Sequence, residues 1–132
     1  MEPLLLGPGE GERISDAPER FLAIKAGLEE IAVTESRYAQ GERGPDAHIH
    51  REHVDAFYVV EGEVAFELGA DAEDHRAPAG TFVAVPPGVV HSFRNDGPPD
   101  ARYVNIHAPA RAFTTTCAGC ATPPPTRSAR WS

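Results

Sequence analysis

Short apolar runs, several of them rich in β-branched residues, alternate with glycine and proline along the first 113 residues of the chain. Runs of this length and composition, bounded by turn formers, are typical of β-strands. They predict strands at 20–25, 30–38, 57–60, 64–68, 81–85, 89–93 and 102–107. Turn signals recur about every eight to twelve residues, the spacing of a sandwich or barrel, so we predict an all-β domain.

The turn formers also make local predictions. Glu61-Gly62, between two of the predicted strands, predicts a hairpin. Asn95 is expected to cap the turn after its strand, and helix is expected only in a short piece near Asp16–Glu19. Glycines expected in turns with positive φ are Gly62, Gly80 and Gly88.

Composition divides the chain into two parts. A length of 132 residues fits one domain, which we place at residues 1–113. Residues 114–132 contain three consecutive prolines and almost no aliphatic residue, so we expect a weakly ordered tail. The two cysteines, Cys117 and Cys120, lie in this tail without the further ligands that a closed zinc site needs.

Charge and hydropathy limit the partners. A formal net charge of −8 argues against binding nucleic acid, whose phosphates would be repelled. No apolar stretch approaches the roughly 20 residues of a membrane span, and Leu4–Leu6 is too short for the core of a signal peptide. We therefore expect a cytoplasmic protein without membrane contact. The apolar runs at Leu4–Leu6 and Phe21–Ile24 favour a homodimer, because exposed apolar strand edges need cover.

Three histidines and one aspartate suggest metal chemistry. His48 and His50 are two positions apart, so in a strand both side chains point to the same face. His91 follows the rigid turn Pro86–Gly88 on another predicted strand. Asp55 supplies an oxygen donor at the start of a further strand. Three imidazoles and a carboxylate suit one divalent Mn, Fe, Co, Ni, Cu or Zn ion and leave positions open for a small molecule.

The spacing of these residues resembles the two sequence motifs of the cupin superfamily, and specifically its small single-domain members. The first motif reads His-x-His, three or four residues, Glu, six residues, Gly. Its fixed positions are occupied here by His48, His50, Asp55 and Gly62. The chain departs from this motif in two ways. Asp55 replaces the usual glutamate. In the family, five residues separate a preceding glycine from the first histidine, whereas here only three residues separate Gly44 from His48.

The second motif is matched at every fixed position. It reads Gly, five residues, Pro-x-Gly, two residues, His, three residues, Asn, and it corresponds to the segment Gly80–Asn95. The resemblance implies a double-stranded β-helix, a jelly-roll barrel of two antiparallel sheets with the metal inside. Because aspartate is one methylene shorter than glutamate, Asp55 either ligates directly or supports a three-histidine site.

The pattern also makes predictions for other polar and aromatic residues. We expect Glu52 to be solvated, His53 to be exposed in a turn, and His75 to lie in a loop. His107 ends a predicted strand, where a structural role is favoured over lining the pocket. Phe82 is expected in the core or the pocket wall. Candidate pocket residues are Tyr38, Phe57, Phe66, Phe93, Asn105 and His107.

The resemblance implies several functions. Cupins include dioxygenases, isomerases, decarboxylases, storage proteins and ligand-sensing modules, so the fold alone does not select a reaction. We expect a small metal-dependent enzyme acting on a small molecule, with a dioxygenase as the leading interpretation and an isomerase as another. The alternative is a non-catalytic module that binds or senses a small ligand through the same ion. A purely structural or storage role ranks third.

Overall fold

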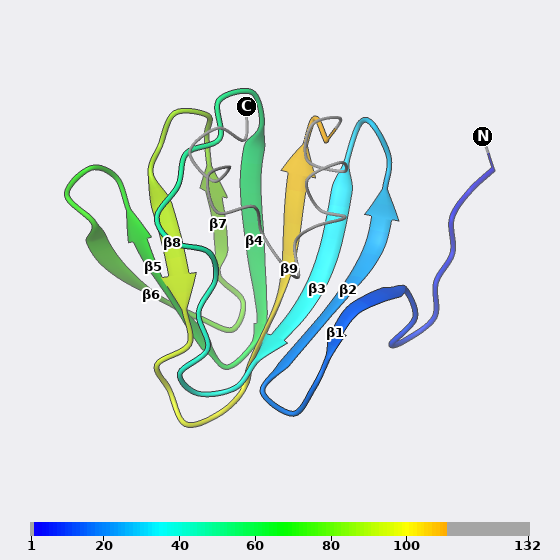
Figure 1. Cartoon of the computed structure of the whole chain (residues 1–132), viewed down its shortest axis with the longest axis horizontal. Coiled ribbons are helices and arrows are strands. Elements are labelled where there is room, and N and C mark those ends of the chain that lie inside the picture. Colours follow the sequence, from blue (N-terminus) through cyan, green and yellow to red (C-terminus); the bar gives the residue numbers. More distant parts are fainter. Residues whose placement is uncertain (1, 111–132) are drawn as a thin grey trace.

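The computed structural model describes residues 2–110, which form nine strands and no helix (Figure 1). The strands are β1 (Glu12–Asp16), β2 (Arg20–Gly27), β3 (Ala32–Tyr38), β4 (Val54–Glu61), β5 (Glu63–Leu68), β6 (Glu73–Pro78), β7 (Phe82–Val85), β8 (His91–Arg94) and β9 (Ala101–Ala108). The described part of the chain accordingly contains no helix that could cross a membrane. Residues 114–132, for which we predict a weakly ordered tail, lie outside it.

The strands form two antiparallel sheets, as expected of an all-β jelly roll. The larger sheet has the order β1-β2-β3-β9-β4-β7, and the smaller has the order β6-β5-β8. Every predicted strand is present, but β1 and β6 were not predicted. Both lie at sheet edges and consist mainly of exposed polar residues, so they lack the apolar pattern of a buried strand.

The predicted helix near Asp16–Glu19 is wrong. Residues 17–19 instead form the bend between β1 and β2. Ala17 and Arg20 exchange two backbone hydrogen bonds across this bend, at 2.9 and 3.1 Å. The strand pairing on either side of the bend outweighs the weak helical preference of so short a piece.

The predicted hairpin around Glu61-Gly62 is also wrong. Strand β4 pairs with β7 and β9, whereas β5 pairs with β6 and β8, so this turn is a corner between the two sheets. Gly62 has a φ of 73°, and a Cβ there would collide with the carbonyl oxygen of Asp100. The expected positive φ at Gly80 and Gly88 is likewise confirmed, with values of 93° and 89°.

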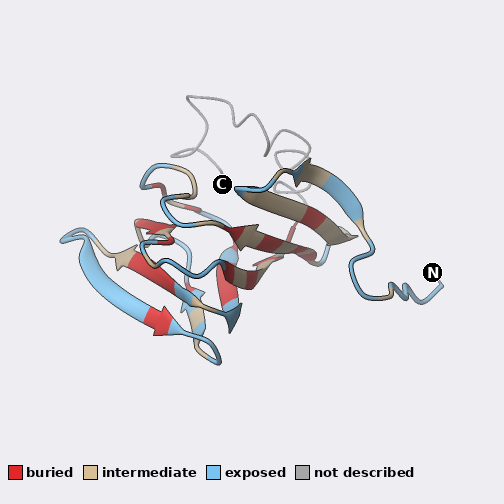
Figure 2. Cartoon of the chain, turned by 90° about the horizontal axis from the view of Figure 1, so that it is seen from below, coloured by how far each residue is buried: buried red, intermediate tan, exposed pale blue. Residues whose placement is uncertain are grey.

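The hydrophobic core takes side chains from both sheets. Buried positions alternate along the strands, most regularly along β3 (Figure 2). The ring of Phe57 lies at the centre, with centroids 4.9 Å from Phe66 and 5.0 Å from Phe93, while Tyr38 stacks on Phe93. Phe82, expected in the core or pocket wall, is instead 59% exposed. It lies opposite Tyr58 on the outer face of the larger sheet.

Residues 39–53 connect β3 to β4 without forming a regular strand. The segment runs beside β8 and pairs with it through isolated bridges at Arg43–Arg94 and His48–His91. The turn after β8 is capped as expected, because Asn95 Oδ1 accepts a hydrogen bond from Gly97 N at 3.0 Å. Asn95 Nδ2 also donates to the carbonyl oxygen of Tyr38 at 2.9 Å, which joins this turn to the end of β3.

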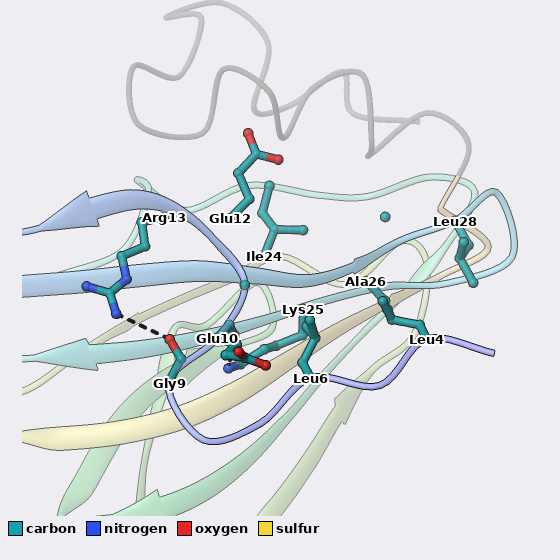
Figure 3. A pocket seen from close by; sticks show the side chains of 12 residues that line it. Leu4, Leu6, Gly9, Glu10, Glu12, Arg13, Ile24, Lys25, Ala26 and Leu28 are labelled. Carbon is teal, nitrogen blue, oxygen red and sulfur yellow. Dashed lines mark hydrogen bonds between the residues drawn. The ribbon is translucent and has the colours of Figure 1, made fainter. Parts of the chain in front are cut away.

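An open hollow of about 740 Å³ lies between the N-terminal segment and β2 (Figure 3). Its apolar lining includes Leu4, Leu6, Ile24 and Leu28. Next to it, Leu5 is 89% exposed. None of the residues that line this hollow belongs to the histidine cluster described below, so we treat it as part of an outer apolar surface.

Candidate metal centre

Two of the predicted ligands are tied together through their backbones. His48 N donates to the carbonyl oxygen of His91 at 3.1 Å, and His91 N donates to that of His48 at 3.0 Å. The turn before β8 is tied to the same segment, because Gly88 N donates to the carbonyl oxygen of His50 at 2.8 Å. His48 and His50, both buried, therefore lie on an irregular segment that is held against β8, not within a regular strand.

Backbone carbonyls orient two of the imidazole rings. Nδ1 of His48 donates to the carbonyl oxygen of Asp46 at 2.8 Å, and Nδ1 of His91 donates to that of Val89 at 3.0 Å. A carbonyl oxygen can only accept, so in both rings Nδ1 carries a proton and Nε2 is the nitrogen suited to a metal. Such hydrogen bonds commonly fix the orientation of metal-binding histidines.

Asp55 lies at the centre of the cluster. It is 2% exposed, and its inward side chain is opposite His107 across the β4–β9 pair. Oδ2 lies 3.2 Å from Nε2 of His50 and 2.8 Å from Nε2 of His91. Oδ1 lies 3.3 Å from Nε2 of His107 and accepts a hydrogen bond from Nδ2 of Asn105 at 2.5 Å. Both carboxylate oxygens are thus held by several elements of the fold.

The donor set fits a first-row divalent cation. One ligand atom each from His48, His50, Asp55 and His91 lies within 4.8 Å of the others, and all four residues are buried. Ligands about 2.0–2.2 Å from an ion lie about 3.0–3.5 Å from one another at neighbouring corners of its coordination polyhedron. The Asp55–His50 and Asp55–His91 distances of 3.2 and 2.8 Å are close to this value.

Burial sets the protonation of the cluster. It lowers the pKa of His48 to about 4, with a further contribution from His91 that outweighs the opposing hydrogen bond to Asp46. Burial also lowers the pKa of His50, although Asp55 opposes this. For Asp55 burial acts in the opposite direction, but the neighbouring histidines outweigh it and hold the pKa well below its ordinary value. Near pH 7, His48, His50 and Asp55 are therefore in the protonation states that bind metals.

Comparison with known proteins assigns the family. The family model described as the cupin domain matches residues 34–107. The chain belongs to the cupin family. Quercetin 2,3-dioxygenase from Bacillus subtilis (strain 168) is 32% identical over 97 residues, which are 71% of this chain but only 28% of that enzyme.

Solved cupins share the fold of this chain. A cupin described as RmlC-like, from Shewanella frigidimarina, has a TM-score of 0.69 at 24% identity, covering 83% of this chain and 94% of its own. KdgF from Halomonas sp. has a TM-score of 0.65 at 22% identity, covering 77% and 91% of the two chains. Likeness at this level of identity shows that the two-sheet architecture is common to these cupins.

His53 is an additional member of the cluster in this cupin. Contrary to the exposed turn position that we predicted, it is 2% exposed, and its ring centroid lies 4.2 Å from that of His50. Burial, followed by the proximity of His50 and His107, lowers its pKa to about 3. The sequence contained a signal for this position: His53 precedes Asp55 and Phe57 at intervals of two, the period of the inward face of β4.

The other predicted site residues fall into two groups. Asn105 and His107 lie on β9 and contact Asp55 directly. Four aromatic residues pack in the hydrophobic core, where contact with a ligand stays a prediction; they are Tyr38, Phe57, Phe66 and Phe93. Away from the cluster, Glu52 is exposed as expected. His75 is also exposed, but it lies in β6 rather than in the predicted loop.

Proposed function

We propose that this cupin binds one divalent transition metal ion through His48, His50, Asp55 and His91 and acts on a small molecule at that ion. The observation that carries this proposal is the convergence of four buried donor atoms within 4.8 Å. Three imidazoles with one carboxylate suit Fe, Mn, Ni, Zn, Co or Cu. When bound, such an ion supplies Lewis-acid or redox chemistry.

The residues of the chain prepare this site. The backbone bonds of His48 and His91 fix the position and the tautomer of two ligands. Asn105 Nδ2 donates both to Asp55 Oδ1 and to the carbonyl oxygen of Ala56, the latter at 2.9 Å. This pair of bonds orients the carboxylate so that Oδ2 faces His50 and His91.

For the reaction we propose a dioxygenase, which the similarity to quercetin 2,3-dioxygenase supports. The chain spans only 28% of the length of that enzyme. The alternative is a non-catalytic module that binds or senses a small ligand through the same ion. Oxygen consumption by the metal-loaded protein with catechols, flavonols or thiols separates the two. Metal-dependent ligand binding without turnover would favour the sensing module. The cytoplasmic location and the absence of nucleic-acid partners stay predictions from the sequence.

The first prediction concerns metal content. Protein purified without chelators is expected to contain about one equivalent of metal, measured by elemental analysis. Chelation is expected to lower the melting temperature, because an ion that binds only the native state stabilises it by mass action. His48→Ala should lose most of this metal, whereas His75→Ala, which alters an exposed histidine outside the cluster, should not. An unchanged melting temperature after complete metal removal would contradict the proposal.

The second prediction concerns assembly. We propose a homodimer, supported by the exposed side chains of Leu4 and Leu5. Leu4 lines the apolar hollow (Figure 3). Light scattering is expected to give the mass of a dimer at micromolar concentration, and Leu4→Glu combined with Leu5→Glu should give a monomer. Phe82→Glu is the matched control on another exposed apolar patch. If only the control dissociates the dimer, the contact lies on the outer face of the larger sheet instead.

A further inference from the structure

Three histidines form a second group beside the proposed metal site. One ring nitrogen each from His50, His53 and His107 lies within 4.8 Å of the others, and all three side chains are buried. The ring centroid of His53 lies 4.2 Å from that of His50 and 5.0 Å from that of His107. The ring centroids of His50 and His107 are 5.3 Å apart. Neither His53 nor His107 occupies a fixed position of the two cupin motifs.

The fold brings these three histidines together from different places. His50 belongs to the irregular segment beside β8, His53 comes just before β4, and His107 lies on β9. The pairing of Asp55 with His107 across β4 and β9 sets the distance between the second and third of these positions. A buried core can be packed without three imidazoles in mutual contact. Histidine is fully buried less often than aliphatic residues are.

Asp55 connects the two groups. Its Oδ2 faces His50 and His91, which belong to the first site, at 3.2 and 2.8 Å. Its Oδ1 faces His107, which belongs only to the second group, at 3.3 Å. A carboxylate with one oxygen toward each position can serve two ions at once, as in enzymes whose sites hold two metals.

We propose that His50, His53 and His107 form a second metal-binding position, adjoining the first and joined to it by Asp55. Three imidazoles with one carboxylate oxygen suit a borderline dication such as Zn²⁺. His50 is common to both positions. A neutral imidazole offers one lone pair to a metal, so when both ions are bound His50 bridges them as an imidazolate after releasing its ring N–H proton to solvent. The second ion binds more weakly than the first, because two dications then share one buried carboxylate and repel each other.

The test is Zn²⁺ uptake by the full chain, measured by equilibrium dialysis and elemental analysis. The background carries Cys117→Ser and Cys120→Ser, which removes both thiols as competing ligands. This protein is expected to bind a second equivalent with an affinity about 5- to 150-fold below that of the first, the usual range of coupling between sites. In the same background, His53→Ala is expected to lose only the second equivalent, and His75→Ala is expected to lose neither.

A second variant isolates the new position. His48→Ala combined with His91→Ala removes two ligands of the first site, and it is expected to keep one equivalent of Zn²⁺. That equivalent should bind more tightly than the second ion of the parent protein, since repulsion by the first ion is gone. Adding His53→Ala should abolish it, while circular dichroism checks that each variant retains its strands. A merely supportive role of His53 in orienting the first site would not produce an ion that survives loss of His48 and His91.

The outcomes separate this inference from the proposed function. It is overturned if the parent binds one equivalent and the His48→Ala, His91→Ala variant binds none, a result that leaves the first site intact. The inference is also overturned if the ion that the His48→Ala, His91→Ala variant retains stays bound when His53→Ala is added. By contrast, a parent protein that binds one equivalent, loses it with His53→Ala and keeps it in the His48→Ala, His91→Ala variant would contradict the first site and support the second.

Discussion

Replacing Asp55 with alanine is expected to lower the affinity for the first metal ion by about 100-fold or more, since loss of even a supporting group typically costs 10- to 100-fold. The carboxylate contacts His50 and His91 through Oδ2, so its removal takes away both a donor atom and the negative charge of the site. Asn105 also loses a buried acceptor, which is expected to destabilise the metal-free protein by about 1–3 kcal/mol. Metal titration and chemical denaturation measure the two effects.

Two variants serve as controls for this prediction. Asp55→Glu restores the carboxylate that is usual in the family and is expected to retain metal binding. Glu52→Ala removes an exposed carboxylate three positions away and should have little effect. If Asp55→Ala binds the first ion with unchanged affinity, the site is a three-histidine site. If His53→Ala weakens the first ion more than Asp55→Ala does, His53 is the fourth donor.

Acidification from pH 7 is expected to destabilise the metal-free protein. The folded-state pKa values of His48, at about 4, and His53, at about 3, lie below the ordinary value of 6.5, and that of His50 is lowered as well. Below pH 6.5 the unfolded chain therefore binds more protons than the folded protein. The free energy of unfolding then decreases as the pH decreases, by up to about 1.4 kcal/mol per pH unit for each such histidine. The depressed pKa of Asp55 extends the loss below its ordinary value of 3.8.

Urea denaturation of the chelated protein between pH 7 and pH 4 measures this slope. His53→Leu removes one of the titrating groups and should make the dependence shallower, by up to about 1.4 kcal/mol per pH unit. His75→Leu makes the same substitution at an exposed histidine outside the cluster and is the matched control. A stability that is flat between pH 6.5 and pH 4 would show that the buried histidines take up protons as readily in the folded state as in the unfolded one.

The sequence predicted the architecture and the first group of donors because both depend on regular spacing. Alternation and turn formers located the inner strands, and the two motifs placed His48, His50, Asp55 and His91 at positions that the fold does bring together. Which strands pair with one another was harder to predict from the sequence. The apolar runs on either side of Gly62 have the appearance of a hairpin, and only the positions of β7, β8 and β9 show that they belong to different sheets.

His53 was missed for a different physical reason. It follows the exposed residues Arg51 and Glu52, so its local sequence resembles a solvated turn. Its burial depends on contacts with His50 and His107, and the latter is more than fifty positions away along the chain. A local sequence pattern does not show which distant residues come into contact. The two-residue period from His53 through Asp55 did indicate that His53 faces inward.

The long sequence separations within the site have a consequence for the folding pathway. Asp55 meets His91 and Asn105 across separations of 36 and 50 residues, so the ligands converge only after distant strands have paired. Contacts of this kind are slow to form because a long loop must close before they contribute. A metal ion would then find its full set of donors only in a nearly native chain. Such an ion would slow the unfolding rate and leave the folding rate almost unchanged.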